Sequence, residues 1–234
     1  MPFPPSSCRS HSLAAICRLG AWVGVICIVG ASGAQSGFEL ERMRLVAQQR
    51  FGAVGGEGVD AWRKALGAWR GLSEDEQLRR VNEYFNRRIR FAEDSAVWSQ
   101  PDYWATPLET IARGAGDCED FVFAKYFTLR ELGIAEDRLR MTYVRATVGG
   151  PGSSVSQAHM VLSYYPAPDV VPLVLDNLIV DIRSATARPD LAPVFSFNMQ
   201  GVFVGGASQA SSPVDRVSRW RELLLRMRSE GYMP

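Results

Sequence analysis

The stretch GDCEDFVFAKYFTLRELG, residues 116–133, decides the fold of this 234-residue chain. It predicts a helix from Asp117 to Leu132, because Gly116 breaks the chain before it and Gly133 ends it. Apolar side chains lie around much of the circumference of this helix, which is typical of a central helix. Cys118 falls in the first turn, where backbone N–H groups and the helix dipole favour an anion and so lower the pKa of a thiol.

Helical patterns precede this stretch and strand patterns follow it. Ser73 and Glu76 form a capping-box pattern that opens a predicted helix over residues 73–90, and residues 92–107 are expected to be a loop. Residues 35–70 show weak helical periodicity with several glycines, and no element is assigned there. Strands are expected at 139–147, 158–165, 172–182, 192–197 and 202–204, with a basic helix at 217–229. Helices followed by a meander of strands predict an α+β fold with an antiparallel sheet.

The first 34 residues are typical of a secretory signal peptide. They hold Arg9 and Arg18 but no acidic residue, then a short apolar run, and end in small residues suited to cleavage near Ala34. A membrane anchor is the alternative, but the apolar run is shorter than the roughly 20 residues that span a bilayer. A lipoprotein would need a small residue before Cys27, where the chain has Ile26. The expected mature protein is one exported domain, residues 35–234.

Removal of this segment leaves Cys118 as the only cysteine and His159 as the only histidine. No intramolecular disulfide can then form, so the thiol is inert, linked to a partner, or reactive. The mature chain would carry 24 basic and 25 acidic residues, which favours neither nucleic acid nor an anionic membrane as a partner.

Cys118 and His159, if they meet, form the two essential parts of a cysteine nucleophile site. His159 lies in one predicted strand and Asp176 in the next, so their side chains can share a face and Asp176 can orient the imidazole. The backbone N–H of Cys118 is a candidate oxyanion donor. The alternatives are a buried structural cysteine and a core histidine, an Asp176 that only opens a turn, and Asp181 as a rival acid.

Three motifs make the chain resemble a known family. Residues 114–121 (GAGDCEDF), 158–165 (AHMVLSYY) and 173–178 (LVLDNL) resemble the motif blocks of the bacterial transglutaminase-like cysteine proteinases, most closely the LapG type. The likeness continues at 104–109, 188–191 and 193–198, and covers most of residues 73–198.

This resemblance implies a papain/transglutaminase-like fold, in which N-terminal helices and a nucleophile at a central helix start pack on an antiparallel sheet carrying His and Asp. It places the catalytic triad on Cys118, His159 and Asp176. It also implies a periplasmic endopeptidase that cleaves the N-terminal region of a large repeat adhesin, releases it from the surface and promotes biofilm dispersal. An inner-membrane cyclic di-guanylate receptor is implied as its inhibitor.

Three carboxylates, Asp117, Glu119 and Asp120, flank the thiol and would oppose its ionisation. A divalent cation would neutralise them, and the family resemblance implies Ca²⁺ held by acids beside the cysteine. Calcium prefers oxygen ligands, which carboxylates and the carbonyls of a loop such as 102–105 supply. The alternative needs no metal, since acids in a first turn also stabilise the helix dipole.

Two other functions stay open at this point. A transglutaminase-like acyl transferase would use the same triad and act on glutamine side chains. A catalytically inactive binding module would keep the fold with a structural cysteine.

Overall fold

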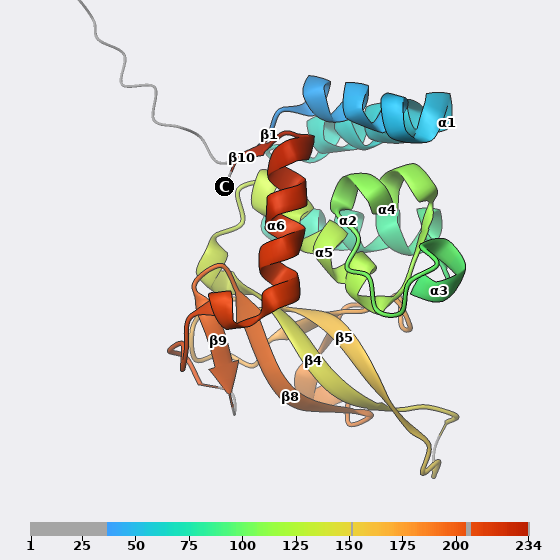
Figure 1. Ribbon diagram of the computed structural model, residues 1–234. Helices are drawn as coiled ribbons and strands as arrows, with labels where there is room; N and C mark the ends of the chain where they lie inside the picture. Colours follow the sequence, from blue (N-terminus) through green and yellow to red (C-terminus); the bar gives the residue numbers. More distant parts are fainter. Residues whose placement is uncertain (1–36, 151, 205–206, 234) are drawn as a thin grey trace, which may run out of the picture. The chain divides into compact units, whose positions relative to one another are not determined.

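The computed structural model describes residues 37–150, 152–204 and 207–233. The predicted signal peptide, residues 1–34, lies outside them. Helices gather on one side of an antiparallel sheet, and α5 (Cys118–Glu131) lies between the other helices and the strands (Figure 1). The predicted α+β class with an antiparallel sheet is therefore confirmed.

The main sheet has the strand order β7-β6-β5-β4-β8-β9, with every neighbouring pair antiparallel. Its strands are β4 (Leu139–Thr147), β5 (Ser156–Tyr164), β6 (Leu173–Leu175), β7 (Arg183–Ser184), β8 (Leu191–Asn198) and β9 (Gly201–Val204). Val144 lies opposite His159 and Leu162 lies opposite Leu175. This register places the end of β6 next to the C-terminal part of β5.

Two short pairs complete the strand arrangement. In one, β1 (Gly37–Phe38) pairs with β10 (Tyr232–Met233), so the two ends of the described chain meet. In the other, β2 (Arg90–Phe91) runs parallel to β3 (Ala115–Gly116), directly before α5. The second pair fixes the backbone that leads into the Cys118 helix.

The central helix lies where the sequence predicts it. In α5 every side chain from Asp120 to Leu129 is buried, because helices cover one side of it and β4 and β5 the other. Trp62 Nε1 donates a hydrogen bond to Thr128 Oγ1 at 3.0 Å, which satisfies two polar atoms in this core. Helices α2 (Glu74–Arg88) and α6 (Ser218–Glu230) also match their predicted ranges within a few residues.

Residues 40–69, to which no element was assigned, form the long helix α1 (Leu40–Trp69). Gly52 has a φ of +72°, and there the helix turns back, so that its two arms lie side by side (Figure 1). A Cβ on Gly55 would lie 2.7 Å from the carbonyl oxygen of Ala47, closer than real contacts allow. Gly52 and Gly55, two of the glycines that weaken the helical pattern, are thus required by the tight turn.

Three local predictions are wrong. The strand predicted at 172–182 ends at Leu175, because Asp176 Oδ1 accepts a hydrogen bond from the Leu178 N–H at 3.1 Å and forms a turn. The loop predicted at 92–107 contains the short helix α3 (Asp94–Val97), and α4 (Pro107–Arg113) begins at its end.

The third concerns the capping box predicted at Ser73. Ser73 does accept from the Glu76 N–H, but the Glu76 carboxylate pairs with Arg79 and Arg80 instead of returning to Ser73. The complete capping box is formed by Thr106 and Glu109, at the start of α4.

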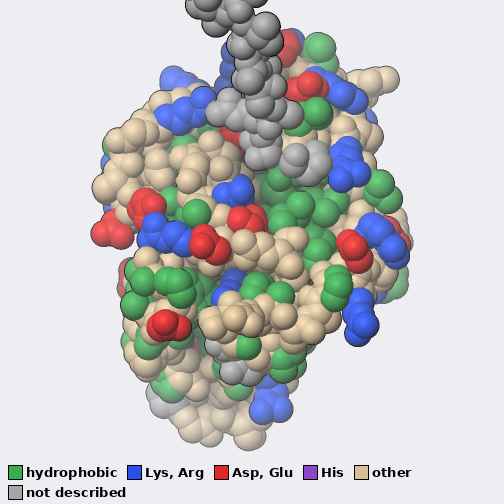
Figure 2. Space-filling view, turned by 90° about the vertical axis from the view of Figure 1, so that its left-hand side faces the viewer, with side chains coloured by type: hydrophobic (Ala, Val, Ile, Leu, Met, Phe, Trp, Pro, Cys, Tyr) green, Lys and Arg blue, Asp and Glu red, His purple; other side chains and the backbone are tan. Residues whose placement is uncertain are grey.

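On the face shown in Figure 2, basic and acidic side chains are interspersed among apolar ones. Within the part of the chain that the structure describes, no helix has both the length and the apolar character that crossing a membrane would require.

Candidate active site

Cys118 is the first residue of α5, preceded by Asp117 as the N-cap. The approach to it is tight: a Cβ on Gly116 would lie 2.5 Å from Asp120 Oδ2, so only glycine fits before the helix. Cys118 is half-buried and lines a cavity of about 710 Å³ together with His159. The structure therefore brings the single thiol and the single imidazole of the described chain to one cavity, as the sequence predicts.

His159 and Asp176 form the second part of the site. His159 Nε2 lies 2.8 Å from Asp176 Oδ1, and both side chains are buried. Because Nε2 faces the carboxylate, Nδ1 is the ring nitrogen left for the thiol. Asp181, the rival acid, is exposed and pairs with Arg183 instead.

The Asp176 carboxylate is held in the ionised state. Burial alone would raise its pKa, but hydrogen bonds from His159, Leu178 and Arg188 lower the pKa of Asp176 to about 2. Arg188 Nη2 donates to Asp176 Oδ2 at 2.8 Å, and this guanidinium is itself buried. At neutral pH, Asp176 therefore accepts a hydrogen bond from the Nε2–H of His159 and leaves Nδ1 as the basic nitrogen.

The backbone of Asp176 is held as firmly as its side chain. Its carbonyl oxygen accepts from Asn86 Nδ2 at 2.7 Å and from Lys125 Nζ at 3.1 Å. Lys125 is fully buried in α5, and burial lowers its pKa to about 7. Two helices thus fix the position of the residue that follows β6.

The surroundings of the thiol oppose its ionisation. Burial raises the pKa of Cys118 well above its usual range, and the nearby Glu119 and Asp117 carboxylates raise it further. The thiol donates to Glu119 Oε2 at 3.0 Å, while the backbone N–H of Met160 acts in the opposite direction. These surroundings favour the neutral thiol over the thiolate.

Among the described residues, Asp94, Asp117 and Glu119 place carboxylate oxygens within 4.8 Å of one another. Burial and the neighbouring acids raise the pKa of Asp117 to about 10, and burial raises that of Asp94 to about 6. Asp117 Oδ1 and Asp94 Oδ1 are buried without a hydrogen-bond partner. Carboxylate oxygens that lie close together and have no hydrogen-bond partner suit a divalent cation that prefers oxygen ligands.

Of the three acids predicted to bind the metal, Asp117 and Glu119 belong to this group and Asp120 lies outside it. Asp120 Oδ1 accepts from the Ala105 N–H at 2.8 Å, and its Oδ2 has no partner. The loop at 102–105 turns amide groups toward the acids, since the Tyr103 N–H also binds Asp94. The carbonyls of Asp102 and Trp104 accept from arginines of α6 instead.

Comparisons with known proteins agree with this arrangement. Residues 70–189 match the family described as bacterial transglutaminase-like cysteine proteinase. The chain belongs to this family. Among curated protein sequences, no significant match is found.

Solved structures of LapG from Legionella pneumophila are similar to this proteinase. One is 36% identical, with a TM-score of 0.69 over 82% of this chain and 99% of that one. An EGTA-treated form is also 36% identical, with a TM-score of 0.71 over 82% and 100% of the two chains. A calcium-bound form is 37% identical, with a TM-score of 0.69 over 80% and 98%. The predicted transglutaminase-like fold is confirmed, and the protein is a cysteine protease.

Two residues of the proteinase site have no assigned role in the sequence analysis. Asp94 lies in a segment expected to be a loop, and 22 residues separate it from Asp117, so no local spacing relates them. Arg188 lies in one of the stretches that resemble the family, but its contact with Asp176 depends on the turn after β6. A buried carboxylate needs a positively charged partner, and this requirement at Asp176 is the signal that could have pointed to Arg188.

Proposed function

We propose that this proteinase is a calcium-dependent cysteine endopeptidase with Cys118, His159 and Asp176 as its triad. The observation that carries the proposal is the His159–Asp176 hydrogen bond of 2.8 Å beside the cavity that Cys118 lines. An ionised carboxylate that fixes Nε2 of a histidine leaves Nδ1 to take the proton of a thiol.

In the proposed reaction, each residue of the triad has its usual role in a cysteine protease. His159 Nδ1 accepts the Cys118 proton, and the thiolate attacks the carbonyl carbon of the scissile peptide bond. The free N–H of Cys118 in the first turn of α5 stabilises the oxyanion. His159 then gives the proton to the leaving amine, and water, activated by the same imidazole, hydrolyses the thioester. Asp176 stabilises the imidazolium throughout.

Asp94, Asp117 and Glu119 would hold the calcium ion. The fit rests on three clustered carboxylates, two of which have a buried oxygen without a partner. A similar protein, the Legionella LapG, has a calcium-bound form. When bound, the cation supplies positive charge beside Cys118, which offsets the carboxylates that raise the pKa of the thiol.

The proposed substrate is the N-terminal region of a large repeat adhesin, cleaved in the periplasm so that the adhesin is released and the biofilm disperses. The proposed inhibitor is an inner-membrane receptor for cyclic di-guanylate. Both parts rest on the motifs shared with LapG-type proteases at residues 114–121, 158–165 and 173–178. The signal-peptide pattern of residues 1–34 supports the periplasmic location.

The deciding experiment incubates the purified mature proteinase and Ca²⁺ with the N-terminal segment of an adhesin encoded beside it. Cleavage by the wild type and none by Cys118→Ala is expected. Cleavage that survives in Cys118→Ala would refute the nucleophile. Incorporation of an amine into glutamine side chains without cleavage would instead identify an acyl transferase. Parallel fractionation of cells checks the location.

A further inference from the structure

A second cavity lies on the sheet face that α5 does not cover. Along β4, Met141 and Tyr143 contact the main core, so the alternate residues Thr142 and Val144 point to the opposite face. There Val144 joins Val161 and Val174 in a small apolar cluster separate from the main core. These residues line a cavity of about 390 Å³. This volume is within the range of small-molecule sites.

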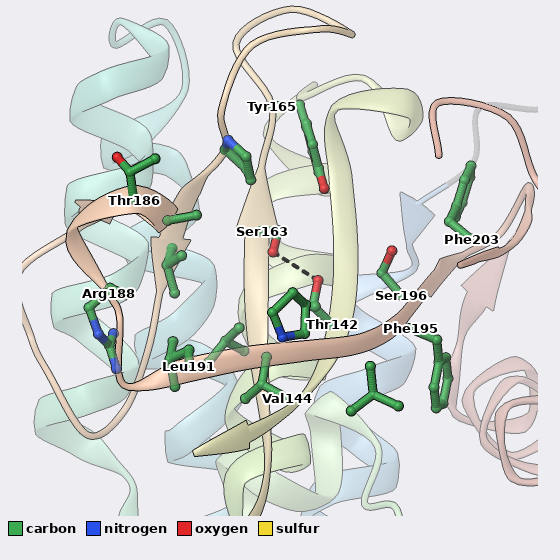
Figure 3. A pocket seen from close by; sticks show the side chains of 16 residues that line it. Thr142, Val144, Ser163, Tyr165, Thr186, Arg188, Leu191, Phe195, Ser196 and Phe203 are labelled. Atoms are coloured by element: carbon green, nitrogen blue, oxygen red, sulfur yellow. Dashed lines mark hydrogen bonds between the residues drawn. The ribbon is translucent and has the colours of Figure 1, made fainter. Parts of the chain in front are cut away.

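Figure 3 shows the side chains that line this cavity, with Arg188 at one side and Phe203 at the other. The lining is mostly aliphatic and aromatic, and Arg188 is its only charged residue. Thr142 Oγ1 and Ser163 Oγ lie 2.8 Å apart and satisfy each other. Besides the hydroxyl groups of Tyr165, Thr186 and Ser196, the polar recognition of a ligand falls to Arg188.

One nitrogen of Arg188 has no acceptor. Its Nε donates to Asp190, and its Nη2 donates to Asp176 and Asp190. Its Nη1 is buried and has no hydrogen-bond partner among the described residues. A buried guanidinium N–H without an acceptor costs free energy, so a ligand that supplies one gains affinity.

The charges already around Arg188 favour a neutral acceptor over an anionic one. Two carboxylates, Asp176 and Asp190, already face the single positive charge of Arg188, at 2.8 Å each. A third anion would meet a local excess of negative charge and would lose its hydration in an apolar cavity. A neutral carbonyl oxygen would satisfy Nη1 without that penalty.

We propose that this cavity binds a small, uncharged, largely aliphatic molecule through one carbonyl oxygen, which accepts a hydrogen bond from Arg188 Nη1. An aliphatic amide or ester has this chemistry. The same guanidinium holds Asp176, so the bound molecule would contact the residue directly behind the His159–Asp176 pair. The site is separate from the Cys118 cavity, since the two share no lining residue.

The test is calorimetric titration of the folded, calcium-loaded proteinase with N-methyloctanamide, with octanoate as the charged counterpart. Saturable one-to-one binding of the amide is expected, with octanoate at least tenfold weaker. Equal or tighter binding of octanoate would overturn the assignment of a neutral acceptor. No saturable amide binding at millimolar concentration would overturn the site. Because no substrate is cleaved in this assay, its outcome is independent of the proposed function.

Variants locate the binding. Val194→Trp places a large side chain on the exposed part of the lining and should weaken amide binding at least tenfold. Val204→Trp makes the same change at an exposed valine of β9 outside the lining, and should stay within twofold of the wild type. Thr186→Trp, also on the lining, replaces Val194→Trp if that variant does not fold. Equal affinities in all variants would contradict the location.

A labelled probe tests the contact itself. The carbonyl carbon of ¹³C-labelled N-methyloctanamide should move downfield on binding, because a charged donor polarises the carbonyl. A bound amide whose carbonyl shift matches that in an apolar solvent would overturn the role of Arg188.

Discussion

Asp176 is hydrogen-bonded through both carboxylate oxygens, with Oδ1 2.8 Å from His159 Nε2 and Oδ2 2.8 Å from Arg188 Nη2. Both contacts favour the ionised carboxylate. The contact with His159 lowers the pKa of Asp176 most, while Arg188 lowers it further and holds the second oxygen in place. Arg188 is thus a positioning residue for the proposed triad.

Asp176→Asn should leave the fold intact and lower kcat by about 10³- to 10⁴-fold, because the amide cannot stabilise the imidazolium. Arg188→Met should also lower kcat, and it should destabilise the protein by about 3–5 kcal/mol, since it leaves buried carboxylates unpaired. Steady-state kinetics and thermal unfolding measure the two effects. Wild-type kcat in Asp176→Asn would exclude Asp176 from the triad.

The Arg188 contact also predicts a pH effect. The pKa of Asp176 is lowered to about 2 in the folded protein, so its contribution to stability is present above its unfolded pKa and is lost as the pH falls toward 2. In Arg188→Lys, which keeps the charge but not the planar donor pair, the pKa of Asp176 should be lowered less, so the loss should be smaller and should be complete at a higher pH. Unfolding temperatures measured from pH 6 to pH 2 check this. Parallel curves for the two proteins would contradict the prediction.

Glu119→Gln should make the thiol more reactive in chelator. The Glu119 carboxylate accepts a hydrogen bond from Cys118 and raises its pKa, so the neutral amide should lower that pKa. The rate of iodoacetamide alkylation, followed against pH in excess EGTA, measures the thiolate fraction. Equal profiles for variant and wild type would show that Glu119 does not control the thiol.

Asp94→Asn should weaken calcium binding by at least tenfold, because Asp94 contributes an oxygen to the cluster with Asp117 and Glu119. Glu93→Gln is the matched control, since it removes the same charge from an exposed neighbouring residue. Calorimetric titration with Ca²⁺ gives both affinities. Equal weakening in the two variants would point to general charge and not to a ligand at Asp94.

Gly116→Ala should destabilise the protein by about 1–3 kcal/mol and should lower activity, because the new Cβ would displace Asp120 beside the nucleophile. Gly67→Ala is the contrasting change. Gly67 lies within α1 with open space where a Cβ would go, so alanine should stabilise the protein by about 0.5–1 kcal/mol. Urea unfolding curves measure both. A neutral Gly116→Ala would show that the approach to Cys118 is more tolerant than the contact distance implies.

The sequence is most informative where one periodicity holds over many residues. The helix that begins at Cys118 and the strands β4, β5 and β8 have uninterrupted apolar patterns, and they form as predicted. The long helix α1 was missed, because the glycines required at its turn also remove the pattern that would reveal it. The turn at Asp176 was missed because it depends on one side-chain hydrogen bond.

The candidate site divides in the same way. Cys118, His159 and Asp176 could be proposed from sequence, since each is unusual in its surroundings and two lie in adjacent predicted strands. Asp94 and Arg188 could not be assigned roles, because their contacts join segments whose relative placement depends on packing. Charged residues that are far apart in the sequence and meet only in the fold leave no spacing pattern in the sequence.

Helix α5 sets the spacing between residues of the proposed triad. Cys118 is its first residue, and Lys125, two turns further on, binds the main-chain oxygen of Asp176. Cys118 and the side chain that anchors the Asp176 backbone therefore belong to one rigid helix, although Asp176 itself follows a strand. A mutation that shortened, kinked or rotated this helix between residues 118 and 125 would change the distance across the proposed triad without altering any of its three members.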